Sequence, residues 1–455
     1  MQIDQYEIKH TTLPDIGADP MSVVISQLPV DDLKNFAETT PGFKQNVHRE
    51  ALRRLHSTGL NTKKYTTYTA SMSALQKQDK LEKMLWRPVA AGGGGFALVV
   101  TDGTLWQITY KLQVSTKSKI QINSRVRNVY RSEDEATLDR YTNVTIDENG
   151  YVYIWGQNDF LSLSSVPKKI DSLSRIITVA LGSNHCLAVD IFGGVYSWGR
   201  NQKGQCGHPI TEYIEAPLLI TNNTGQCVQV AAAGHEHSII VTQRGHVFTF
   251  GADYTGQLGL GQNHKYDNEN RNTYFKATPQ PVSITLDGNE VHITDVAAGA
   301  AHCIALDTQG RIFGWGNNEV GQLGEGDKDE QYEVFLDPVH IHLFQWKTVR
   351  VAACTSNTFA WTAGGSLFQW GAMTDANGHF TRNSKPSYIG PRAITTGSFF
   401  EENIIVVTKE NRVMQIYTDV DENNDRTSED APRWGCIGMK CDQQSIVNGK
   451  LHAMQ

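Results

Sequence analysis

Residues 296–324 read VAAGAAHCIALDTQGRIFGWGNNEVGQLG, and the same pattern returns along the chain. Close copies are VALGSNHCLAVDIFGGVYSWGRNQKGQCG from Val179 and VAAAGHEHSIIVTQRGHVFTFGADYTGQLG from Val230. The large apolar residue before the second glycine marks seven copies, and its column runs Ile108, Trp155, Trp198, Phe250, Trp315, Trp370 and Ile416. Spacings along this column range from 43 to 65 residues. Such a small unit cannot bury its own apolar face, so its copies must stack or close into a ring.

Each copy is typical of short β-strands joined by tight turns. The apolar runs VAA, CIAL and RIFGW of residues 296–315 are separated by Gly299 and by the turn DTQG, without helical periodicity. Glycine recurs where the turn needs a positive φ, at positions 103, 150, 193, 245, 310 and 365, and Asn411 replaces it in the last copy. We therefore predict a mainly β protein, a seven-bladed β-propeller with small residues such as Ala297 packed near its axis.

The repeat signature V-A-x-G-x-x-H-x-x-A-L, followed by G-x-V-x-x-W-G-x-N-x-x-G-Q-L-G, resembles that of the regulator of chromosome condensation family. The resemblance covers residues 86–417 and implies a seven-bladed propeller. It is strongest around Gly182, Gly234 and Gly299, whereas Gly95 and Asn357 replace the signature histidine in the first and sixth copies. Weak terminal copies are expected where strands from both chain ends seal the ring.

Composition narrows the class of partner. The chain has 455 residues, a net charge of −7 and a pI near 6.1, which give no general attraction to nucleic acid or to anionic membranes. It has no apolar run of membrane-spanning length, and its start, MQIDQYEIKH, does not have the pattern of a signal peptide. The seven cysteines are scattered singly, which favours a reducing compartment. We expect a cytoplasmic and/or nuclear protein.

A second motif precedes the repeats. Residues 13–47, LPDIGADPMSVVISQLPVDDLKNFAETTPGFKQNV, resemble an F-box, although the interval from Leu13 to Leu28 is about three residues longer than usual. The resemblance implies binding to the Skp-type adaptor of a Skp/cullin/F-box ubiquitin ligase. The residues expected to contact the adaptor or to support that contact are Leu13, Pro14, Ile25, Leu28, Leu33 and Phe36. The alternative is a helical cap packed on the propeller's own edge.

These motifs divide the chain into four parts. Residues 1–60 form the F-box-like helical module, and 61–85 form a polar connector with a short helix over Ala74–Leu85. Residues 86–417 form the propeller, and 418–455 comprise an acidic linker followed by a segment that returns to order or docks on the propeller.

Catalytic chemistry is missing from these patterns. His185, His237 and His302 occupy one repeated position, so we assign them to the scaffold as buried histidines satisfied by neighbouring backbone. The tryptophan column invites comparison with a related receptor type that uses clustered tryptophans to sense light, but a repeated large ring fills the gap between blades. His340 and His342 have no third ligand at metal spacing. We expect a non-catalytic protein with no cofactor and no metal.

Recognition is expected where the repeat varies. The polar insertion 262–281 carries aromatic residues, and the loops that follow the aromatic–glycine step, 200–203, 253–255 and 317–320, share one face by repetition. The candidate substrate-binding residues are Arg200, Lys203, His235, Asp253, Tyr254, Tyr266, Tyr274, Phe275 and Glu319.

Three functional classes remain open. The first is a substrate-recognition subunit of a Skp/cullin/F-box ubiquitin ligase, in which the F-box binds the adaptor and the propeller binds a target protein. The second is a guanine-nucleotide exchange factor for a small GTPase, which the resemblance to the propeller family suggests. The third is a propeller scaffold without a catalytic connection.

Overall fold

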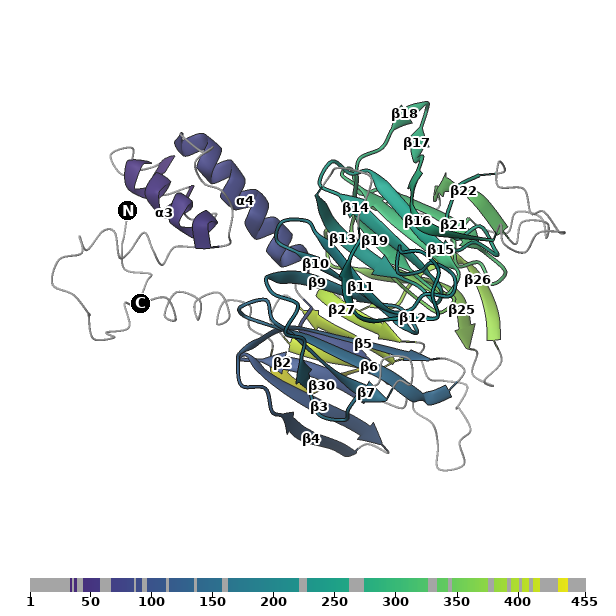
Figure 1. Cartoon of the computed structure of the whole chain (residues 1–455), viewed down its shortest axis with the longest axis horizontal. Helices are drawn as coiled ribbons and strands as arrows, with labels where there is room; N and C mark the ends of the chain where they lie inside the picture. Colours follow the sequence, from purple (N-terminus) through teal and green to yellow (C-terminus); the bar gives the residue numbers. More distant parts are fainter. Residues whose placement is uncertain are drawn as a thin grey trace. The chain divides into compact units, whose positions relative to one another are not determined.

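The computed structural model describes residues 33–34, 37–38, 44–57, 67–85, 87–91, 96–111, 114–134, 137–157, 163–220, 227–261, 274–325, 334–342, 346–374, 380–390, 394–400, 403–408, 412–417 and 433–440. The chain divides into two compact units, Met1–Leu85 and Trp86–Gln455. The first is helical and the second is built of β-strands (Figure 1).

The N-terminal unit contains helices α3 (Lys44–Ser57) and α4 (Tyr68–Leu85), which pack against each other. The backbone is also helical at residues 33–34 and 37–38. His48 on α3 and Ser71 on α4 form a hydrogen bond of 2.8 Å between Nδ1 and Oγ. The buried apolar side chains of this unit are Leu33, Ala37, Val47, Ala51, Met72 and Leu75.

Helix α4 differs from the predicted connector. It begins at Tyr68 rather than Ala74 because Thr67 caps it, with Thr67 Oγ1 accepting the Ala70 N–H at 3.2 Å. Met72 and Leu75 face inward, so this segment packs on α3 as part of the helical unit instead of only linking two bodies.

The C-terminal unit is a seven-bladed propeller of four-stranded antiparallel sheets, which confirms the predicted fold class. The first strands of successive blades contact one another in a closed order, from β1 through β5, β9, β13, β19, β23 and β27 back to β1. Blades 1 to 3 comprise β1 (Val89–Ala91), β2 (Phe96–Thr101), β3 (Thr104–Lys111), β4 (Val114–Ile120); β5 (Val126–Asp134), β6 (Thr137–Asp147), β7 (Val152–Gln157), β8 (Lys168–Lys169); and β9 (Ile176–Leu181), β10 (His185–Asp190), β11 (Val195–Arg200), β12 (Tyr213–Leu219). Blades 4 to 7 comprise β13 (Val228–Ala233), β14 (His237–Thr242), β15 (Val247–Ala252), β16 (Phe275–Val282); β19 (Ile293–Ala298), β20 (His302–Asp307), β21 (Ile312–Asn317), β22 (Val334–His340); β23 (Thr348–Cys354), β24 (Asn357–Thr362), β25 (Leu367–Thr374), β26 (Phe380–Tyr388); and β27 (Ile394–Phe400), β28 (Asn403–Thr408), β29 (Arg412–Tyr417), β30 (Arg433–Lys440).

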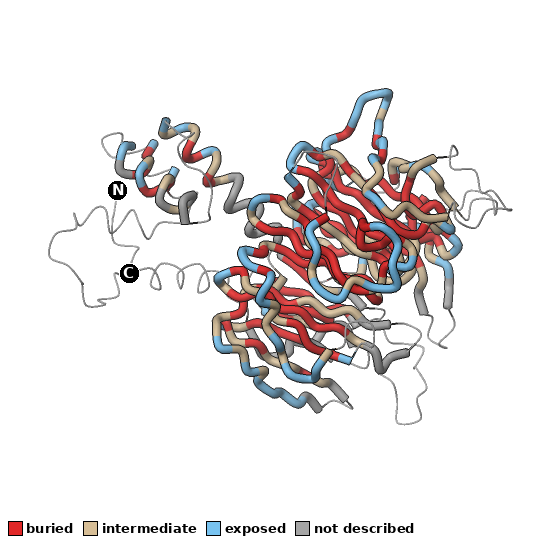
Figure 2. The backbone as a smooth tube through the Cα atoms, in the orientation of Figure 1, coloured by how far each residue is buried: buried red, intermediate tan, exposed pale blue. Residues whose placement is uncertain are grey.

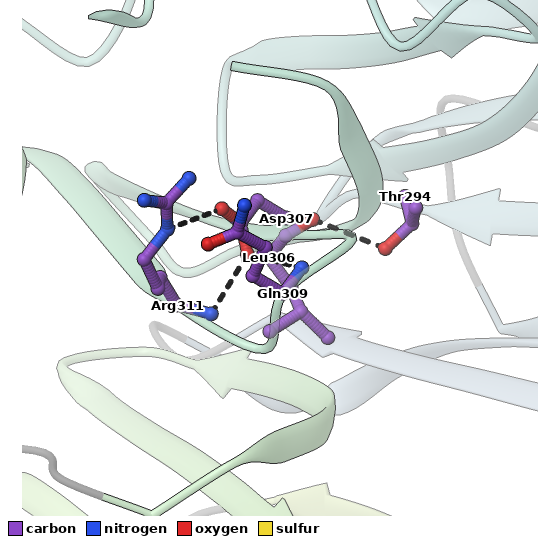
Figure 3. Close-up of polar contacts among 5 residues, drawn as sticks. All are labelled: Thr294, Leu306, Asp307, Gln309 and Arg311. Atoms are coloured by element: carbon purple, nitrogen blue, oxygen red, sulfur yellow. Dashed lines mark hydrogen bonds and ion pairs between the residues drawn. The ribbon is translucent and has the colours of Figure 1, made fainter. Parts of the chain in front are cut away.

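The turn between the second and third strands explains the repeated aspartate and glycine. In blade 5, Asp307 Oδ1 accepts the N–H groups of Gln309 and Arg311, both at 2.8 Å, and Oδ2 accepts Arg311 Nε at 2.6 Å (Figure 3). Gly310 follows with φ of +85°. Asp147 and Asp190 accept equivalent backbone N–H groups in blades 2 and 3, so the predicted turn recurs with the same internal bonds.

The apolar core lies between adjacent blades, where the large residue of each repeat packs against apolar side chains of the adjacent blade. Trp155, Trp198, Phe250, Trp315 and Trp370 are all buried, and Trp198 packs among Val144, Ile154 and Ile176 of blades 2 and 3. Buried residues follow the inner strands of the blades, and exposed ones gather at turns and on some outer strands (Figure 2). The column therefore fills gaps between blades, as predicted.

The repeated histidines join each of three blades to the next. His302 Nε2 lies 2.9 Å from Thr358 Oγ1 of blade 6, and that hydroxyl donates to the Gln322 carbonyl at 2.7 Å. Because the single hydroxyl proton goes to the carbonyl, we assign the proton of the imidazole to Nε2. His185 and His237 make the same joint through Ser238 and Cys303.

These histidines are buried as predicted, and their Nε2 atoms contact side chains of the next blade, which the prediction of backbone partners did not include. Their Nδ1 atoms are buried without a hydrogen-bond partner within the described residues. Burial first, and the neighbouring His237 second, lower the pKa of His302 to about 3. Burial and neighbouring histidines likewise lower the pKa of His185 to about 3, and burial and His235 lower that of His237 to about 4. The imidazoles are therefore neutral in the folded protein.

Closure of the ring differs from the expectation that strands from both chain ends share a sheet. Blade 1 consists of β1–β4 and blade 7 of β27–β30, so each is built from consecutive strands. Ile108 of blade 1 packs with Ile405 and Val413 of blade 7, and the Ala91 N–H donates to Ser398 Oγ at 3.0 Å. The outer strand β30 lies beyond the predicted propeller boundary at residue 417, because only three strands of the last blade precede the acidic run.

Candidate interaction face of the propeller

The loop between the third and fourth strands of a blade is held by its own side chains. In blade 3, Asn201 Oδ1 accepts the Cys206 N–H at 3.1 Å, and Gln205 Oε1 accepts the Lys203 N–H at 2.9 Å. Asp253 with Gln257 in blade 4, and Asn318 with Gln322 in blade 5, repeat this arrangement. The side-chain oxygen of the repeated glutamine therefore holds the loop, and its backbone carbonyl accepts the hydrogen bond from the next blade.

The residues inside each braced loop vary and face outward. Gln202, Tyr254 and Glu319 are exposed at equivalent positions of blades 3, 4 and 5. Turns between first and second strands reach the same face, since the Ala252 N–H donates to the Glu236 carbonyl at 2.8 Å. We call this surface the loop face and define it by residues 200–206, 234–236, 252–258, 299–301 and 317–323.

An aromatic and basic cluster forms where blades 3 and 4 meet on the loop face. Lys203 Nζ lies 5.3 Å from the centroid of the Tyr254 ring, which lies 5.9 Å from the ring of Tyr274. The Asp253 N–H donates to the Tyr274 carbonyl at 2.7 Å and fixes this tyrosine beside the loop. Cation–π contact and two adjacent phenols suit recognition of a protein surface.

Arg200 is held within the loop face by two neighbours. Its Nη2 donates to Gln202 Oε1 at 2.7 Å, and its Nη1 lies 3.9 Å from Glu236 Oε1 of blade 4. The guanidinium therefore bridges two blades and presents only part of its surface. Gln202 and Glu236 were not among the sequence candidates; Gln202 holds Arg200 from within the same loop, whereas the role of Glu236 depends on contact between blades.

Asp253, a predicted contact residue, braces its own loop. Its Oδ1 accepts the Leu258 N–H at 3.0 Å, in the place that Asn201 and Asn318 fill in neighbouring blades. Burial raises the pKa of the Asp253 carboxyl to about 6, although the Leu258 N–H and the Lys276 charge act in the opposite direction.

The other candidates are distributed as follows. His235 is exposed in the turn before β14, where its N–H donates to the Ala300 carbonyl of blade 5 at 3.2 Å. Phe275, at the start of β16, is partly buried, and Glu319 is exposed. Tyr266 lies outside the described residues, as do the F-box-like residues Leu13, Pro14, Ile25, Leu28 and Phe36. Leu33 is fully buried, which suits a supporting residue rather than a direct adaptor contact.

A projecting hairpin was also missed by the sequence analysis. Strands β17 (Thr285–Leu286) and β18 (Asn289–Glu290) pair between blades 4 and 5 and extend away from the propeller (Figure 1). Asp287 and Gly288 form its tip, both with positive φ. The sequence LDGN is the signal for this turn, because Asp-Gly favours a two-residue hairpin.

Within the described ranges, no group of three or more His, Cys, Asp or Glu residues is placed to hold a metal ion. No helix in the part of the chain that the structure describes is both long and apolar enough to cross a bilayer. The loop face offers side chains for contact with a macromolecule.

The fold and the loop face define a repeat propeller whose loops between third and fourth strands are braced in blades 3 to 5. A profile of the RCC1-like domain matches residues 140–416, more than half of the sequence. The chain belongs to the RCC1-like domain family.

Comparisons with individual proteins agree with this family. The chain is similar to human Protein RCC2, with 30% identity over 310 residues, covering 63% of this chain and 55% of that protein. It is 34% identical over 230 residues to the Arabidopsis thaliana Ultraviolet-B receptor UVR8, covering 48% of each. The chain thus spans about half the length of these curated relatives. The solved structure of yeast RCC1 (Prp20) bound to Kap60 matches with a TM-score of 0.58 and 18% identity, covering 81% of this chain and 83% of the other.

Proposed function

We propose that this protein is the substrate-recognition subunit of a Skp/cullin/F-box ubiquitin ligase in the cytoplasm and/or nucleus. Its N-terminal unit binds the Skp-type adaptor, and the loop face binds the target protein. The observation that carries this proposal is the division into a helical unit, Met1–Leu85, and a separate propeller. The F-box-like motif falls in the first unit, whose buried Leu33 and Val47 belong to its own core.

The adaptor half is tested by co-elution of the full-length chain with a purified Skp-type adaptor. The double variant Ile25→Asp/Leu28→Asp places two charges in the motif and removes co-elution, because adaptor contact needs apolar side chains. Lys44→Ala/Gln45→Ala, at two exposed residues of α3, is the matched control and retains co-elution. The proposal fails if the wild-type chain does not co-elute, or if the aspartate variant does so equally well.

The target half is tested by capturing proteins from native extract and identifying them by mass spectrometry. Lys203→Glu/Tyr254→Ala disrupts the aromatic and basic cluster and removes proteins that depend on the loop face. The control is Lys168→Ala, at an exposed lysine on the outer strand of blade 2. A target on the loop face is excluded if both variants capture the same proteins in the same amounts.

Nucleotide exchange on a small GTPase is a second candidate, favoured by the β17–β18 hairpin. A Cβ added to Gly288 at its tip meets nothing within 4 Å, so the tip is sterically open to insertion against a partner. Release of a fluorescent GDP analogue from a Ran-like GTPase distinguishes this function. Acceleration by the wild-type chain, lost when residues 285–290 are replaced by Gly-Ser, would favour exchange.

A further inference from the structure

The outer strand of blade 3 exposes an unusual amount of apolar surface. Tyr213, Leu218 and Leu219 on β12 are 43%, 51% and 47% exposed, and Ile210 just before it is 48% exposed. Ile214 and Pro217 are the half-buried residues of β12, and Ile214 packs against the cluster between blades 2 and 3. We define the blade 3 edge by these four exposed apolar side chains and the exposed carboxylates of Glu212 and Glu215.

Outer strands of the following blades are flanked more closely by the preceding blade. A Cβ on Gly204 would lie 2.4 Å from Ala277 Cα of β16, and one on Gly321 would lie 2.6 Å from Ser384 Cα of β26. Glycine thus lets the loop of one blade approach the outer strand of the next. The side chains of β16 and β22 are mostly half-buried as a result.

Blade 2 lacks this device. Residues 157–167, which connect its third and fourth strands, contain no glycine, so the close approach seen at Gly204 has no counterpart in sequence. Val166 in this connection is itself 65% exposed. The blade 3 edge thus follows the blade whose connection lacks the glycines found at 204 and 321.

The blade 3 edge is acidic as well as apolar. Glu212 and Glu215 are exposed beside Tyr213, and neither carboxylate forms an ion pair with a described residue. In the described sheet β12 pairs only with β11, so a strand can be added along its outer edge. The Tyr213 carbonyl already accepts Thr211 Oγ1 at 3.4 Å and Pro217 has no N–H, so side-chain contacts carry most of the recognition. Pairing with a second copy of the same edge would bring four carboxylates together, which disfavours self-association.

We infer that the blade 3 edge docks an extended segment of another protein in which basic residues alternate with apolar ones. The apolar side chains of that segment cover Tyr213, Leu218 and Leu219, and its Lys or Arg residues pair with Glu212 and Glu215. This surface belongs to the propeller unit and contains none of the variable positions of the loop face, so the inference does not depend on the proposed ligase function.

Selection of a phage-displayed random peptide library on the full-length chain tests the inference. Peptides selected by the wild-type chain should alternate Lys or Arg with apolar residues and bind at least about tenfold more weakly to Leu218→Asp/Leu219→Asp. Selection on Glu212→Lys/Glu215→Lys should instead enrich acidic peptides. Both variants change exposed side chains, and unchanged thermal unfolding verifies that they fold.

Tyr254→Ala on the loop face is the matched control and should bind the selected peptides as the wild-type chain does. The inference is overturned if no peptides are enriched, or if the blade 3 variants bind the same peptides equally well. It is also overturned if sedimentation shows a wild-type dimer that Leu218→Asp/Leu219→Asp dissociates, because a second copy would then be the occupant.

Discussion

Replacing Asp253 by Asn is expected to stabilise the propeller. The carboxyl is largely buried, yet its hydrogen bond to the Leu258 N–H needs only one oxygen. Asn201 and Asn318 make that bond with an amide oxygen in the same loop of blades 3 and 5. An asparagine therefore keeps the loop braced while removing a desolvated charge.

The magnitude follows from the pKa of Asp253, which burial raises from 3.8 to about 6. The unfolded carboxyl ionises first, so stability is lost as the pH rises from 3.8 to about 6, and the loss is complete above that range. Two pKa units correspond to about 3 kcal/mol at most. Since the amide also needs a partner for its N–H₂, we expect a gain of about 1 to 3 kcal/mol at pH 7.5.

Urea unfolding followed by tryptophan fluorescence measures this gain, with both proteins studied at pH 7.5 and at pH 4. The advantage of Asp253→Asn should shrink at pH 4, where the native carboxyl is protonated. Equal or lower stability of the variant at pH 7.5 would refute the assignment of Asp253 as a buried, destabilising carboxylate. A gain that is independent of pH would refute its electrostatic origin.

Three further outcomes follow from contacts between blades. Thr358→Val should lower the free energy of unfolding by about 2 to 4 kcal/mol, because it orphans His302 Nε2 and the Gln322 carbonyl, whereas Thr358→Ser should cost less than about 1 kcal/mol; equal losses in urea titrations would contradict the joint. Acidification from pH 6.5 toward 3 should lower the free energy of unfolding, because histidines are protonated in the unfolded chain and stay neutral when buried. In His302→Asn the free energy of unfolding should fall less steeply with pH, by about 1.4 kcal/mol per pH unit. An unchanged pH dependence would argue against a neutral His302. Gly204→Ala should cost at least about 2 kcal/mol more than Gly288→Ala in thermal or urea unfolding, because both have positive φ but only the first meets a neighbouring strand; similar costs would mean that the loop yields easily.

The propeller and its buried column could be predicted from sequence because the copies repeat a turn position and a large apolar residue at the same spacing. The turn glycines at 193, 245 and 310 have φ values of +82°, +80° and +85°, as the pattern requires. Partners of His185 and His302 were not predictable in the same way. They lie 53 and 56 residues further along the chain, and the position they contact is filled by different residue types from blade to blade.

The repeat predicted that the loops of blades 3 to 5 are equivalent, and the structure braces them in the same way, but the pattern did not distinguish scaffold residues from variable ones. Tyr254 stands in a variable, exposed position, whereas Asp253 next to it belongs to the scaffold, a difference visible only once Asn201 and Asn318 are seen in the same bonds. The blade 3 edge was missed because the exposure of a side chain on an outer strand cannot be read from the repeat pattern. The segment 61–85 was assigned to a connector because its polar composition obscures the inward-facing Met72 and Leu75.

The first and last blades of the propeller are each built from consecutive strands, so the ring closes where two complete sheets meet. There, blades 1 and 7 meet through apolar side chains such as Val89 and Val407, and no sheet among the described strands draws members from both ends. Such a ring does not depend on where its polypeptide starts. A circularly permuted gene that opens between blades 3 and 4 would still encode seven whole sheets.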